Sequence, residues 1–177
     1  MHDTDLTYTV QVGRIHFDDL VKTYWNDIWN YAFFLTKKHD LAEDIAQDTF
    51  VSAFKSIDRF RGQSSVKTWL LRICRNRVIN HRKSAFFRKV IMVPFIRRSE
   101  TFASAEAEFL DVFMRDKVIT HLFELPFKYR EVLLLEIRNE LSIEEMSTLL
   151  DVPAGTVKSR LHRARRLIQQ KLEEDDV

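Results

Sequence analysis

Residues 151–166 read D-V-P-A-G-T-V-K-S-R-L-H-R-A-R-R, and this stretch indicates the fold of the C-terminal half. Val157, Leu161, Ala164 and Ile168 recur at helical spacing, so one stripe of the predicted helix can face a core. The other faces carry hydroxyl, histidine, lysine and arginine side chains, which are the types that reach phosphates and base edges in DNA. This pattern predicts the second helix of a helix-turn-helix.

The residues before this helix supply the rest of the motif. Ser142, with Glu145 three residues later, predicts the capped start of a short helix. Asp151 and Val152 form the expected turn, and Pro153 stands at the expected first position of the longer helix. A short helix, a tight turn and a longer basic helix are the elements of a helix-turn-helix in order.

Helical periodicity runs through most of the chain of 177 residues, and only three Gly and three Pro argue against a turn-rich β protein. We expect an all-α fold of two small helical domains, 15–83 and 105–172, joined by a flexible linker, 84–104. Pro94 would interrupt a helix in that linker. The other expected helices cover residues 16–35, 40–57, 66–83, 105–125 and 126–139; Asp40, with Glu43 three residues later, predicts a capping-box-like start to the second of them.

Charged residues are unevenly distributed along the chain. The net charge is only +2, yet residues 59–99 contain twelve bases and no acid, and residues 152–172 contain six bases and no acid. The segment between them holds an excess of acids. Two basic blocks separated by an acidic one indicate two contacts with polyanions.

Several classes of function are disfavoured by composition. The six histidines show no ligand spacing with each other or with the single cysteine, Cys74, so we expect no metal site. No glycine-rich phosphate loop is visible, and we expect no enzyme, cofactor or small-molecule substrate. One cysteine, without a signal peptide or an apolar run of membrane-spanning length, favours a soluble cytoplasmic protein.

Three segments, in this order, resemble the extracytoplasmic-function (ECF) sigma factors of bacteria, members of the sigma-70 family: D-L-A-E-D-I-A-Q-D-T-F (40–50), D-R-F-R-G-Q-S-S-V-K-T-W-L-L-R-I (58–73) and V-P-A-G-T-V-K-S-R-L-H-R-A-R-R (152–166). The resemblance covers nearly the whole chain. It implies a subunit of RNA polymerase that directs transcription initiation, commonly in a stress response. The first domain would bind the polymerase core and the −10 promoter element, and the second would bind the −35 element.

The polar face of the second helix resembles the surface with which these factors bind a coiled coil in the largest subunit of the polymerase core. The candidate contacts are Glu43, Asp44, Gln47 and Asp48. An acidic face does not suit DNA, so it should meet protein or water. Without the resemblance, a solvated helix face would be the simpler interpretation.

The resemblance assigns capture of the −10 element to the loop at 60–65 and to the third helix. Holding an extruded base costs a few kcal/mol of unstacking and requires a pocket. Trp69 corresponds to one of two adjacent aromatics that wedge the duplex, and the second position is Leu70; Trp69 could equally be a core anchor beside Ile73. The candidate contacts are Phe60, Arg61, Gly62, Ser64, Lys67, Trp69, Arg72, Asn76 and Asn80.

The basic helix of the helix-turn-helix would read the −35 element through base edges and phosphates. Each bidentate base contact is worth about 1–3 kcal/mol of discrimination. The candidate contacts are Thr156, Lys158, Ser159, Arg160, His162, Arg163 and Arg166.

Other partners and other functions stay open. By family analogy an anti-sigma factor, commonly membrane-anchored, would clamp both domains. The basic, apolar linker could also contact another protein or a membrane surface. The main alternative function is a stand-alone helix-turn-helix regulator. An RNA-binding protein is disfavoured because no RNA-stacking sheet is expected. Affinity for the polymerase core would distinguish a sigma factor from a stand-alone regulator and from an RNA-binding protein.

Overall fold

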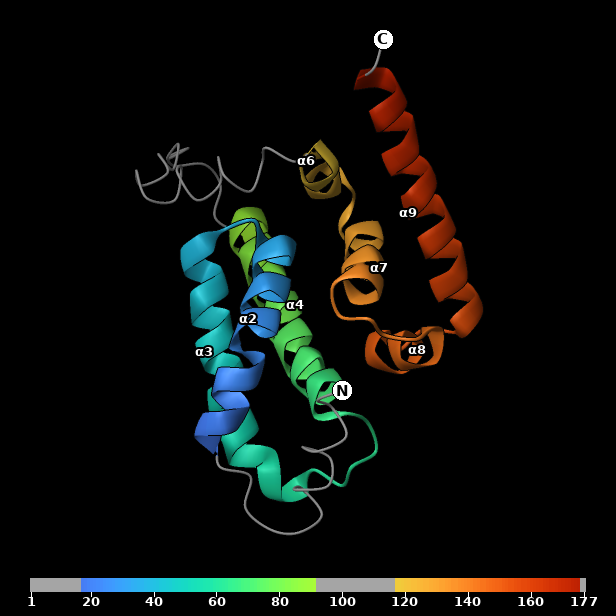
Figure 1. Ribbon diagram of the computed structural model, residues 1–177. Coiled ribbons are helices and arrows are strands. Elements are labelled where there is room, and N and C mark those ends of the chain that lie inside the picture. Colours follow the sequence, from blue (N-terminus) through green and yellow to red (C-terminus); the bar gives the residue numbers. More distant parts are fainter. Residues whose placement is uncertain (1–16, 92–116, 176–177) are drawn as a thin grey trace.

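The computed structural model describes residues 17–91 and 117–175, which form helices and no strands (Figure 1). The all-α prediction is therefore confirmed. Within these two ranges, three long helices form an N-terminal bundle and four helices form a C-terminal bundle. In chain order the elements are α2 (Phe17–Thr36), α3 (His39–Ser56), the 3-10 helix η1 (Ile57–Arg59), α4 (Val66–Ile91), α6 (Lys117–Glu124), α7 (Phe127–Ile137), α8 (Ile143–Leu150) and α9 (Ala154–Asp175).

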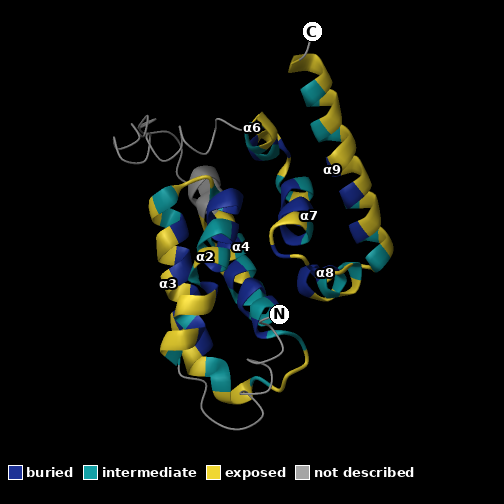
Figure 2. Ribbon diagram, in the orientation of Figure 1, coloured by how far each residue is buried: buried dark blue, intermediate teal, exposed yellow. Residues whose placement is uncertain are grey.

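The N-terminal bundle packs α2, α3 and α4 against one another. The apolar stripe of α3 predicted from periodicity faces inward, with Ala42, Ile45, Ala46 and Phe50 buried. Thr49 is buried within that stripe, and its hydroxyl donates a hydrogen bond to the carbonyl of Ile45 at 2.7 Å, so the polar atom is satisfied. Figure 2 shows the resulting alternation of buried and exposed residues along α3.

The predicted capping box at the start of α3 is wrong. The helix begins at His39, one residue before Asp40, and the N-cap residue Lys38 makes no side-chain cap hydrogen bond. The reason is the short connection from α2. Lys37 takes a left-handed conformation (φ 62°), which reverses the chain direction and lets α3 begin two residues later. Asp40 lies inside the first turn instead, where its negative charge is stabilised by the positive end of the helix dipole.

Helix α4 extends further than its periodicity predicted, from Val66 past Lys83 to Ile91. No glycine or proline stands between these two residues, and the first helix breaker is Pro94. The first part of the predicted linker is therefore helical. Its remainder, and residues 105–116 of the next predicted helix, lie outside the described residues.

The C-terminal bundle contains the predicted helix-turn-helix. Ser142 and Glu145 form the predicted capping box at the start of α8: the Ser142 hydroxyl accepts from the Glu145 amide (3.2 Å), and the Glu145 carboxylate accepts from the Ser142 amide (2.8 Å). Asp151 ends α8 in a left-handed conformation (φ 55°), and Pro153 immediately precedes α9. The turn therefore forms where the sequence indicated, but Pro153 precedes α9 and does not occupy the predicted first helical position.

Removing the cap should weaken this motif measurably. We expect Ser142→Ala to lower the free energy of unfolding by about 1 kcal/mol, because the backbone amide of Glu145 loses its acceptor at the start of α8. In a thermal melt this corresponds to a fall of roughly 2–4 °C. Ser84→Ala, at an exposed position within α4, is the matched control. An unchanged melting temperature for Ser142→Ala would contradict the cap's role.

The end of α2 is buried on all sides. Residues 31–35, Y-A-F-F-L, are consecutive and all buried, whereas a helix covered on one side alone would expose part of such a run. The C-terminal bundle supplies the second cover. The Phe34 ring stacks on Phe123 of α6 at 4.9 Å between centroids, and Phe33 meets the same ring edge-on at 5.6 Å. Both bundles therefore share this aromatic contact.

Candidate nucleic-acid interface

Helix α9 presents a basic face away from its core contacts. Val157, Leu161 and Ala164 are buried, which anchors the helix against its own bundle. Of the predicted −35 contacts, Thr156 and Arg160 are half-buried; those fully exposed are Lys158, Ser159, His162, Arg163 and Arg166. The exposed members lie on adjacent turns, so the predicted contact residues share one accessible surface.

Arg163 is held beside α7. Hydrogen bonding to the Arg163 guanidinium is the main reason that the pKa of the Tyr129 hydroxyl is lowered. Arg165, on another face of α9, pairs with Glu136 and is not among the predicted DNA contacts. The two arginines therefore differ in surroundings while carrying the same charge, which makes them useful for comparison.

The loop before α4 is shaped by Gly62 and by an aromatic pair. Gly62 has φ +67°, and a Cβ atom there would meet nothing within 4 Å, so conformation rather than space favours glycine. Phe60 and Trp69 are half-buried and lie with ring centroids 4.9 Å apart. Trp69 is thus neither fully in the core nor fully exposed. Arg61 is exposed, and Ser64 is half-buried.

The predicted −10 residues on α4 divide into two sets. Asn76 and Asn80 are exposed, one turn apart. Lys67 makes an ion pair with Asp27 at 3.0 Å. Arg72 points toward the C-terminal bundle, where it donates a hydrogen bond to the carbonyl of Thr148 at 3.2 Å. The structure therefore does not bring all of these side chains to one free surface.

The acidic face of α3 is accessible. Glu43, Asp44, Gln47 and Asp48 are all exposed, and Asp48 lies 3.7 Å from Arg77 of α4. The same helix also exposes Val51 and Phe54, at 51% and 61% of their surface. Helical spacing from Phe50 predicts that Phe54 lies on the inward stripe of α3, and this prediction is wrong because the side chain is exposed. Two exposed apolar side chains beside an acidic face are typical of a protein-binding surface.

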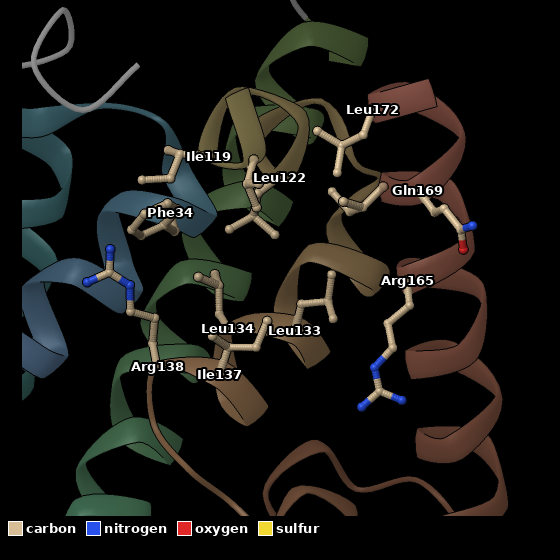
Figure 3. Close-up of a pocket in the computed structure, with 12 residues that line it drawn as sticks. Phe34, Ile119, Leu122, Leu133, Leu134, Ile137, Arg138, Arg165, Gln169 and Leu172 are labelled. Atoms are coloured by element: carbon tan, nitrogen blue, oxygen red, sulfur yellow. The ribbon is translucent and has the colours of Figure 1, made fainter. Parts of the chain in front are cut away.

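A second apolar surface lies in the C-terminal bundle. Helices α6, α7 and α9 enclose a depression of about 420 Å³, and Phe34 of α2 contributes to its lining (Figure 3). Ile137 on its wall exposes 67% of its surface. The guanidinium of Arg138 lies over the ring of Phe34, 5.5 Å from its centroid. This apolar groove is therefore open to a partner.

Within residues 17–91 and 117–175, no cluster of three or more metal-ligating side chains occurs. The described part of the chain also contains no helix that is long and apolar enough to cross a membrane. Burial raises the pKa of the Cys74 thiol to about 12, so this cysteine is protonated at neutral pH and unsuited to act as a nucleophile.

Comparison with known proteins decides the family. The family model for Sigma-70 region 2 matches residues 20–86, and that for Sigma-70, region 4 matches residues 116–168. RNA polymerase sigma factor YlaC of Bacillus subtilis is 31% identical over 90% of this chain and 93% of its own. The ECF RNA polymerase sigma factor SigW of the same organism is 30% identical over 88% of each chain. The chain is an ECF sigma factor of the sigma-70 family.

Solved structures agree with this assignment. The sigma factor RpoE, in complex with the anti-sigma factor NepR from Bartonella quintana, is 25% identical to this sigma factor with a TM-score of 0.67, over 89% of this chain and 96% of that one. CnrH, in complex with the cytosolic domain of CnrY, shares the fold, with a TM-score of 0.68 over 98% of both chains and 24% identity. Like other sigma factors, the protein directs RNA polymerase to promoters. Members of this family are not enzymes.

Proposed function

We propose that this sigma factor divides its task between two domains, with residues 15–83 binding the polymerase core and the −10 element and residues 105–172 binding the −35 element. The observation that supports this division most strongly is the exposed basic face of α9 behind a correctly capped helix-turn-helix. In such a motif the second helix enters the major groove. The exposed candidates Lys158, Ser159, His162, Arg163 and Arg166 are suited to contact bases and phosphates there, with Thr156 and Arg160 at the edge.

For the −10 element we propose that the loop around Gly62 receives an extruded base. Phe60, Arg61 and Ser64 surround that glycine, and aromatic rings favour stacking on unpaired bases. Asn76 and Asn80 are free to hydrogen-bond bases along α4. Lys67 and Arg72 would hold phosphates after exchanging their present partners for DNA.

For the polymerase core we propose the acidic face of α3, formed by Glu43, Asp44, Gln47 and Asp48, with Val51 next to it. At a protein interface, charged side chains around an apolar contact orient the two partners, and the apolar contact contributes to their affinity. The partner surface should therefore be basic with an apolar centre.

Co-elution of the purified chain with bacterial core RNA polymerase tests this proposal. We expect a stoichiometric complex on a sizing column and promoter-specific transcripts from the reconstituted holoenzyme. A folded chain that elutes apart from the core would contradict the proposal and favour a stand-alone regulator.

We also propose that the chain acts in the cytoplasm, has no catalytic site of its own and is held inactive by an anti-sigma factor, which could be membrane-anchored. The similar RpoE structure is a complex with such a factor. An apolar segment of this partner would fit the groove of α6, α7 and α9. Pull-down with an anti-sigma factor from the same organism, compared between wild type and Ile137→Asp, would test the contact.

Strand opening is expected to depend on Trp69. Because Trp69 can stack on an unpaired base, Trp69→Ala should lower transcription from duplex promoters about tenfold, equivalent to about 1.4 kcal/mol of lost stacking. On a promoter with a pre-melted −10 region, transcription by the Trp69→Ala variant should return to the wild-type level. Trp69→Phe, which keeps a ring against Phe60, is the control. Equal losses on duplex and pre-melted templates would show that Trp69 serves the fold instead.

A further inference from the structure

The large apolar side chains that are exposed in residues 17–91 and 117–175 gather on two surfaces. Val51 and Phe54 lie on α3, with 51% and 61% of their surface exposed. Val118 and Ile137 line the groove of α6, α7 and α9, with 47% and 67% exposed. Single apolar residues scattered over a surface need no explanation, whereas apolar residues gathered in patches mark sites of association.

The two surfaces fit each other in shape. The groove is a depression of about 420 Å³, and α3 presents Val51 and Phe54 three positions apart on the outside of a helix. Phe54 is supported from one side by the ring of Phe17, which meets it edge-on at 5.1 Å. A helix that lays two apolar anchors at this spacing into an apolar groove is a common mode of protein recognition.

The charges around the groove are positive. Among the described residues that line it, the charged ones are Arg138 and Arg165, which Figure 3 shows on opposite sides of the apolar lining. Arg165 already pairs with Glu136. Arg138 therefore supplies most of the positive charge that an acidic partner would meet there.

The charges on α3 are negative. The helix carries four acids and one lysine, Lys55. Asp44 and Asp48 lie seven and three residues before Val51, so all three share one side of the helix. Asp48 is partly offset by Arg77 of α4, 3.7 Å away, which leaves Asp44 as the acid best suited to meet a basic groove. Opposite charges around two apolar surfaces orient an encounter between them.

One chain cannot bring its own two surfaces together. Helix α3 packs on α2 and α4 and lies on the side of the N-terminal bundle that faces away from the C-terminal bundle (Figure 1). The groove belongs to the C-terminal bundle. A second copy of the chain, however, presents an α3 face that the groove can receive.

We propose that the α3 face of one chain docks in the groove of another, so that free chains associate head to tail. Val51 and Phe54 of one copy would contact Val118 and Ile137 of the next. Because the two surfaces differ, the contact is heterologous, and an unused surface remains at each end of the assembly. The inference goes beyond the proposed function. One consequence rests on that function: the α3 face cannot meet a second copy and the polymerase core at once.

Sedimentation velocity of the full chain over a range of about 1–200 µM measures this association. We expect the average sedimentation coefficient of the wild type to rise with concentration. Phe54→Asp and Ile137→Asp should each weaken association at least tenfold, because each places an unpaired charge in an apolar contact. Gln170→Asp, at an exposed position of α9 outside the groove lining, is the matched control and should associate as wild type does.

Mixing the two variants gives the decisive result. Phe54→Asp keeps an intact groove and Ile137→Asp keeps an intact α3 face, so an equimolar mixture should form a dimer and nothing larger. A wild type that stays monomeric up to about 200 µM, or a mixture that stays monomeric, would overturn the proposal. Self-association of Ile137→Asp alone, or loss of association in Gln170→Asp, would do the same.

Both altered side chains are more than half exposed, so circular dichroism should show an intact helical fold. If Phe54→Asp does not fold, Val51→Asp replaces it in the mixture. Adding core polymerase should convert the wild-type assembly into complexes with one sigma factor each. A chain that associates with itself but forms no complex with core would refute the proposed function and leave the head-to-tail contact standing.

Discussion

Reversing the charge of Asp44 and Asp48 to lysine should reduce affinity for core polymerase at least a hundredfold. Both side chains are exposed on α3, so the change should leave the fold intact. If this face meets a basic surface, two attractions become repulsions, and like charges placed together at an interface cost several kcal/mol. Co-elution with core on a sizing column, followed by titration of labelled protein, measures the loss.

The matched control for this pair is Glu173→Lys with Glu174→Lys, which makes the same change of net charge at exposed positions near the end of α9. It should bind core as wild type does. If both double variants lost affinity equally, net charge rather than the α3 face would govern binding. The ion pair of Asp48 with Arg77 is surface-exposed and weak, so its loss should contribute little.

Replacing Arg163 with alanine should reduce transcription from a −35-dependent promoter about ten- to a hundredfold and leave core binding unchanged. The side chain is exposed on α9, and a single bidentate base contact is worth about 1–3 kcal/mol. Run-off transcription with reconstituted holoenzyme measures the effect, and a template with a scrambled −35 element should abolish the difference between variant and wild type.

Arg165→Ala is the control for this experiment. It removes the same charge from the same helix, but its partner is Glu136 and it faces away from the predicted DNA contacts. We expect less than a threefold effect. Equal effects at both positions would indicate that general charge, rather than a specific contact of Arg163, supports DNA binding. Loss of core binding in Arg163→Ala would show that its contact with Tyr129 stabilises the fold.

Local sequence patterns predicted most of the helices because each depends on near neighbours. The inward stripe of α3 and the reciprocal cap of Ser142 and Glu145 follow from residues within four positions of one another. The start of α3 was misplaced because a left-handed residue, Lys37, began the helix early without a side-chain cap. The sequence predicts the end of α4 too early because residues 84–104 mix apolar and basic side chains around Pro94, although nothing between Lys83 and Ile91 breaks a helix.

The contact between the bundles could not be predicted in the same way. Glu131 and its partners Tyr31 and Arg75 are separated by 100 and 56 residues, and nothing in their local spacing links them. For the same reason Arg72 was interpreted only as a DNA contact. One signal was available: the run Y-A-F-F-L at 31–35 has too many consecutive apolar residues for a helix covered on one side.

The shared burial of that run has a consequence for solubility. When the bundles part, the rings of Phe33, Phe34 and Phe123 lose their common cover and add an apolar patch to the surface. Exposed apolar patches of this kind promote self-association, more so at higher protein concentration. A chain with its bundles apart would therefore be more prone to aggregate than the arrangement seen here, in which these rings are buried.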